Sequence, residues 1–144
     1  MVFTNKYTQI LMERFPNFAK SISLKETIEL SISDDGIVSA CTVFTGLTRY
    51  VFNDLIKKYQ AITQEELDIY AFVEEIRVKF SHYSDTTDEG DFDGAACVCF
   101  LENLQNRAGR DGFEYSRFIP YLGEKSKEFC RAWDEFTGVK SPGL

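Results

Sequence analysis

The sequence has little of what interrupts helices or crosses membranes. Its 144 residues include only three prolines and nine glycines, which favours long helices over a β-sandwich with many turns. No apolar run approaches the roughly 18 residues that a transmembrane helix needs. Core material is ample, because 44% of the residues are hydrophobic, among them 13 Phe and 7 Tyr. We therefore expect one compact all-α domain over residues 1–144, with about six helices that could stack as hairpins.

The first residues lack the charged start and apolar middle of a secretory signal peptide. This predicts a cytoplasmic protein with no membrane contact. Thiols stay reduced in that compartment, so we expect the cysteines to be free and buried as small apolar groups. The four are Cys41, Cys97, Cys99 and Cys130. With a single histidine, the chain also lacks the partners of a usual zinc site.

One stretch of the chain has no positive charge. Residues 80–106 carry six acidic side chains and no Lys or Arg, and five of these acids lie within residues 85–93. Such a concentration of negative charge repels phosphates, so direct nucleic-acid binding is disfavoured. It attracts basic surfaces and speeds the encounter with them. The alternative is a solvated loop whose charge only keeps the protein soluble.

The spacing of apolar residues predicts six helical regions. They cover residues 4–15, 17–33, 37–59, 63–80, 95–106 and 124–136. The second region also alternates like a strand, so its assignment to a helix rests on its neighbours. In the third, Gly46 predicts a kink or two shorter helices. Thr63 and Glu66 have the spacing of a capping box at the start of the fourth.

The remaining segments are predicted as breaks. We expect turns at residues 33–36, where an Asp could cap the next helix, and at 109–112. Residues 81–94 are predicted to form an acidic loop, and the tail over 138–144 to fray. Phe129, Trp133 and Phe136 lie on one side of the last helix, which predicts core packing, with an exposed contact patch as the alternative.

No catalytic or metal motif stands out. Counted from Asp85, Gly90 takes position six of a calcium loop, but Ala96 stands where the bidentate Glu belongs. His82 with Asp85 or Asp88 could form a transition-metal site, although a lone His beside acids is more often a surface residue. His82 could also pair with Cys97 or Cys99 as a nucleophile, but both cysteines lie in an apolar helix start. We expect no enzyme activity, no catalytic residue, no metal and no cofactor.

Three stretches together resemble an uncharacterised family of small bacterial helical domains. They are TVFTGLTRYV (42–51), CVCFLENL (97–104) and IPYLGEKSKEF (119–129), and the resemblance spans about residues 33–136. Some members of that family are encoded beside polymorphic toxins, so the resemblance implies a toxin-neutralising immunity protein. In such a helix Gly46 would let another backbone come close. Asn103 would hydrogen-bond neighbouring backbone in the core.

The leading hypothesis is therefore an immunity protein whose acidic loop meets basic residues of its toxin. A nuclease is one such toxin. Two aromatic residues in the loop would anchor the contact. The predicted partner-binding residues are Tyr83, Asp85, Asp88, Glu89, Asp91, Phe92 and Asp93. A regulatory or adaptor domain without a toxin partner is the alternative, and a small enzyme that uses His82 is the third.

Overall fold

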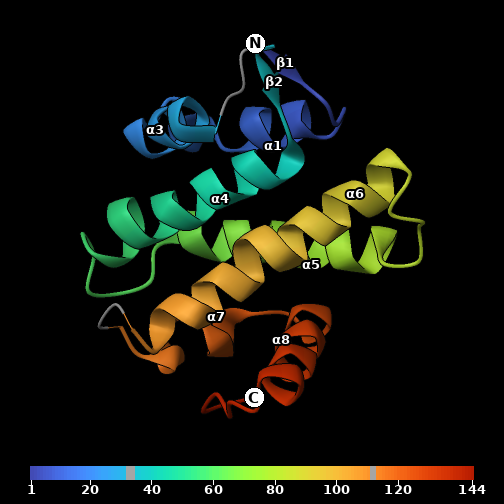
Figure 1. The fold of residues 1–144 in the computed structure, drawn as a ribbon. Coiled ribbons are helices and arrows are strands. Elements are labelled where there is room, and N and C mark those ends of the chain that lie inside the picture. The colour runs from blue at the N-terminus through green and yellow to red at the C-terminus, as the bar shows by residue number, and fades with distance from the viewer. Residues whose placement is uncertain (32–34, 111–112) are drawn as a thin grey trace.

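A computed structural model describes residues 1–31, 35–110 and 113–144. The chain folds as an all-α domain with one small parallel sheet, as the helical pattern predicts (Figure 1). The first half comprises β1 (Val2–Phe3), α1 (Thr8–Arg14), α2 (Pro16–Ala19), α3 (Ile22–Ser31), β2 (Ile37–Val38), α4 (Ala40–Tyr50) and the π-helix η1 (Val51–Ile56). The second comprises α5 (Gln64–Phe80), α6 (Asp88–Ala95), the π-helix η2 (Ala96–Leu101), α7 (Glu102–Ala108), the 3₁₀ turns η3 (Tyr115–Arg117) and η4 (Ile119–Tyr121), and α8 (Glu124–Thr137).

A long helix made of α6, η2 and α7 crosses the molecule (Figure 1). It packs on α4, with α5 behind it and α8 beside its second half. The side chains of Phe44, Tyr70 and Phe100 are fully buried where these helices meet. None of the helices described, from Thr8 onward, is long and apolar enough to cross a membrane.

Two local predictions are confirmed, the first only in part. Thr63 accepts a hydrogen bond from the Glu66 amide, and the helix that it caps ends at Phe80 as expected. The Glu66 carboxylate does not complete the capping box, because it accepts from Tyr70 and Arg117. Gly46 lies where α3 crosses α4, and a Cβ there would come within 3.4 Å of the Leu24 Cα. The helix is not interrupted at Gly46, where a kink was predicted. Its geometry changes at Val51, where α4 continues as the π-helix η1.

The predicted breaks lie partly outside the described residues, at 32–34 and 111–112. The region predicted as helical over 37–59 begins with strand β2, and α4 starts only after it. The N-cap of α4 is Ser39 and not the predicted aspartate. The Ser39 hydroxyl accepts a hydrogen bond from the Thr42 amide. The first helix starts at Thr8 instead of Thr4, and the Thr4 amide donates to the Val38 carbonyl of β2.

Three other expectations are wrong. Residues 88–94 form helix α6 instead of a loop. The tail does not fray, because Ser141 is buried and donates to Asp134 through its amide and its hydroxyl. Phe136 is 82% exposed and stacks on Trp133, so the expected core packing fails there, whereas Phe129 is partly buried and packs against the core as expected. The buried residues of α8 are Ser126, Cys130 and Asp134.

The start of α8 is fixed by a carboxylate from another helix. Glu74 of α5 accepts hydrogen bonds from the amides of Lys125 and Ser126 and from the Ser126 hydroxyl, at 2.8–3.0 Å. A carboxylate suits this place because the first turn of a helix has free N–H groups and a positive dipole end. Gly123 leaves the room for it, since a Cβ there would lie 2.3 Å from the Glu74 side chain.

Candidate partner-binding surface

The predicted partner-binding residues lie on the turn after α5 and on the first turns of α6. Tyr83 is 51% exposed, and Asp85 and Asp91 are exposed as well. Asp88 and Glu89 are partly buried. We call these five residues the acidic surface. Their negative charge at the start of a helix is favourable, because the helix dipole is positive there.

The backbone of this turn is held by short-range bonds. The Ser84 carbonyl accepts from the Thr87 amide at 3.0 Å and from the Thr87 hydroxyl at 2.6 Å. The same hydroxyl accepts from the Gly90 amide at 3.1 Å, which makes Thr87 the N-cap of α6. In the sequence, Thr87 stands directly before the acids of the first turn, which is typical of an N-cap. The density of acids nevertheless led to the prediction of a loop. The acidic surface therefore rests on a defined helix start.

The N-terminal segment is attached to the same helix. Asn5 donates to the Asp88 carbonyl at 2.8 Å and to the Asp91 carboxylate at 2.9 Å. The Lys6 amide donates to the Asp88 carboxylate at 3.2 Å. Asp88 and Asp91 thus hold the fold together in addition to facing solvent. Sequence reasoning missed Asn5, because nothing in the local pattern links it to a segment 83 residues away.

Two of the predicted contact residues point inward. Phe92 is 2% exposed and packs against the rings of Phe44 and Tyr7, so its prediction as a surface anchor is wrong. Asp93 is buried and forms an ion pair with Arg77, a residue that the sequence analysis did not single out. Burial raises the pKa of Asp93, while the Arg77 guanidinium acts to lower it. Both side chains point inward because α6 turns this face onto the core.

Two acids of the surface remain uncompensated. No side-chain hydrogen bond or ion pair involves Asp85 or Glu89 in the ranges that the structure describes. Both charges are therefore available to a cation from outside. An unpaired carboxylate at a protein surface keeps most of its attraction for a basic partner at low ionic strength.

The chemical alternatives find no support in this geometry. Residues 88–95 are helical, so the segment from Asp85 does not wrap around a calcium ion as an EF-hand loop would. His82 is exposed, and the described residues hold no group of three His, Cys, Asp or Glu side chains that could bind a metal.

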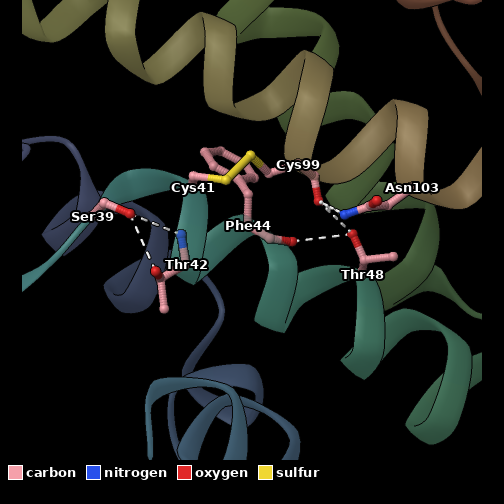
Figure 2. The surroundings of a disulfide bond; sticks show 7 residues. All are labelled: Ser39, Cys41, Thr42, Phe44, Thr48, Cys99 and Asn103. Atoms are coloured by element: carbon pink, nitrogen blue, oxygen red, sulfur yellow. Dashed lines mark hydrogen bonds between the residues drawn. A yellow bond between two sulfur atoms is a disulfide. The ribbon is translucent and has the colours of Figure 1, made fainter. Parts of the chain in front are cut away.

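A disulfide joins Cys41 of α4 to Cys99 of η2, which corrects the prediction that all four cysteines are free (Figure 2). The packing of α4 on η2 brings the two Cα atoms to 5.4 Å, although 58 positions separate them in the sequence. The Cys99 carbonyl beside it accepts from Thr48 at 2.9 Å and from Asn103 at 2.8 Å (Figure 2). The role expected of Asn103, bonding to neighbouring backbone, is confirmed.

Cys97 and Cys130 are free and buried, as expected of them. Burial raises the pKa of each thiol to about 12. A thiol with such a pKa is a poor nucleophile at neutral pH, which disfavours Cys97 as the partner of His82. The other candidate, Cys99, is in the disulfide.

Thiol labelling should reproduce this division of the cysteines. At about pH 8, we expect an aromatic disulfide reagent to label no cysteine in the folded protein, because both free thiols are buried and protonated. In denaturant without reductant it should label two, Cys97 and Cys130. Prior reduction should raise the count to four by opening Cys41–Cys99. Four labels in unreduced denaturant would contradict the disulfide.

Comparison of the chain with protein-family models, with curated proteins and with solved structures found no match.

Proposed function

We propose that this chain is an immunity protein that binds and neutralises a basic toxin domain through the acidic surface. The observation that carries the proposal is the pair of unpaired carboxylates, Asp85 and Glu89, beside the exposed ring of Tyr83. Residues 80–106 of the sequence contain no Lys or Arg. The surface thus combines the charge that attracts a basic partner with an aromatic side chain that can anchor it.

The defined backbone of the surface also favours binding. The hydrogen bonds of Ser84 and Thr87 fix the turn, so little backbone freedom is lost when a partner docks. Acids that face a basic cleft act mainly on the rate of encounter. A toxin that binds an anionic substrate would expose the positive charge that this surface complements. Phe92 and Asp93 take no part in the contact, because they are buried in the core.

The test uses the protein encoded directly upstream of this chain. First, the two are co-expressed, and cell survival and co-purification are recorded. The purified pair is then measured with Asp85→Asn and Glu89→Gln combined. We expect association in low salt to be about 5- to 10-fold slower, with a smaller effect on dissociation. These two side chains are the right ones to change, because the described fold makes no use of their carboxylates.

The matched control removes two charges elsewhere. Glu114 and Glu135 are exposed and lie outside the acidic surface, so Glu114→Gln with Glu135→Gln should change the association rate less than about twofold. Equal rates for both double variants would show that the acidic surface is not the contact. A neighbour that is harmless and does not co-purify would overturn the immunity function, and a lysate pull-down would then look for an adaptor's partner.

A further inference from the structure

A small apolar cavity opens beside the acidic surface, between α1 and α5. Its volume is about 130 Å³. We call it the aromatic pocket, and its apolar lining is Tyr7, Ile10, Phe72, Ile76, Phe80 and Phe92. Three of these side chains, Phe72, Ile76 and Phe92, are buried and form its base. Ile10 is 48% exposed and marks its mouth.

The pocket is continuous with the acidic surface. The Tyr83 ring packs edge-on against Phe80, with the centroids 5.7 Å apart. Tyr7 packs against Phe80 at 4.9 Å and against Phe92 at 5.7 Å. Lys6, next to Tyr7, bonds to Asp88 through its amide. A partner that lies on the acidic surface would therefore also reach the pocket.

The charges at the rim decide which side chain the pocket can take. Arg14 and Lys79 both pair with Glu75, at 3.2 and 3.0 Å. Two cations share one carboxylate, so the rim is positive and disfavours a further cation. The aromatic lining offers apolar contact. An apolar side chain is the occupant that suits both conditions.

We propose that the aromatic pocket receives one leucine-sized apolar side chain from the basic partner, while the partner's Lys and Arg residues meet the acidic surface. This inference rests on the proposed function and names its central contact. A volume of about 130 Å³ is below the 300 Å³ or more of small-molecule sites and suits a single side chain. Apolar side chains that fill such pockets at the centre of an interface commonly dominate its affinity.

Two short lysine-rich peptides test the pocket directly, one with leucine at its centre and one with glycine there. Isoleucine methyl resonances of the protein are followed during titration at low salt. We expect the leucine peptide to bind at least about 10-fold more tightly, as burial of one leucine side chain predicts. It should shift the methyl signals of Ile10 and Ile76, which line the pocket. Ile119, buried outside the pocket, should not move.

A pair of substitutions separates the pocket from general surface effects. Ile10→Trp places a larger side chain at the mouth and should abolish the preference for leucine while the glycine peptide still binds. Ile22→Trp is the control, because Ile22 is 71% exposed on α3 and does not line the pocket. It should leave the preference unchanged.

The outcomes distinguish the two proposals. Equal binding of both peptides to the unaltered protein, weakened by Asp85→Asn with Glu89→Gln, would overturn the pocket and leave the acidic surface intact. Binding of neither peptide at low salt would overturn both. A leucine preference that survives Ile10→Trp would place the apolar contact elsewhere and so overturn the pocket.

Discussion

Reduction of the Cys41–Cys99 disulfide is expected to lower the free energy of unfolding by about 4 kcal/mol, a large part of the stability of a domain of this size. The bridge links residues 58 positions apart, so it restricts a long loop of the unfolded chain. In the chain-entropy description, the stabilisation grows with the logarithm of that loop length. Urea unfolding with and without dithiothreitol measures the difference.

The folded state should survive this reduction. Cys99 lies between Thr48 and Asn103, whose hydrogen bonds to its carbonyl do not involve sulfur. Phe44 and Phe100 also remain packed in the core between α4 and η2. We therefore expect an unchanged far-ultraviolet circular dichroism spectrum at low urea and a lower urea midpoint. The loss should come mainly from the greater freedom of the unfolded chain.

The control for the reductant is the double substitution Cys41→Ser with Cys99→Ser. Its urea midpoint should be close to that of the reduced protein, apart from the small destabilisation caused by the two serine hydroxyl groups. Dithiothreitol should not lower this midpoint further. Cys97 and Cys130 remain free in both proteins. An unaltered protein whose midpoint is the same with and without reductant would contradict the expected stabilisation.

Much of the fold could be predicted because its signals are local. Thr63 marks the start of α5 by accepting from the amide three residues later, and the apolar spacing of α4 indicates which face it buries. Both depend only on the period of the helix and on the free amides of its first turn. The all-α fold follows from a series of such segments.

The acidic segment shows how composition can mislead. Asp88, Glu89 and Asp91 suggested a solvated loop, yet acids are common in the first turn of a helix because they face its positive dipole end. Thr87, which caps that turn, was the local signal that would have corrected the prediction. Once α6 is a helix, its period turns Phe92 and Asp93 toward the core.

Contacts between distant segments could not be predicted from one sequence. Nothing near Cys41 indicates Cys99 as its partner, and nothing near Gly123 indicates that the Glu74 carboxylate lies against it. These pairs depend on how whole helices pack, which a local pattern does not specify. The aromatic pocket is of the same kind, because its lining comes from α1, α5 and α6.

Substitution of the two glycines of α6 by alanine is expected to change the stability of the protein in opposite directions. Gly90→Ala is expected to destabilise the protein by about 3 kcal/mol, because a Cβ there would lie 1.9 Å from the Ser84 carbonyl oxygen. The obstacle is backbone, so the turn that carries Tyr83 and Asp85 must move. Gly94→Ala should stabilise by up to about 1 kcal/mol, since its Cβ would meet nothing within 4 Å and alanine favours the helix.

Because both substitutions add one methyl group to the same helix, their difference isolates the contact with Ser84. Urea unfolding of the two variants measures it. If the protein encoded upstream binds as proposed, its association rate reports whether the acidic surface has moved. Gly90→Ala should slow association even at temperatures where the protein stays folded, whereas Gly94→Ala should leave the rate unchanged. If Gly90→Ala were as stable as Gly94→Ala, the turn would not be fixed against α6. The acidic surface would then lack the defined backbone that the proposed contact requires.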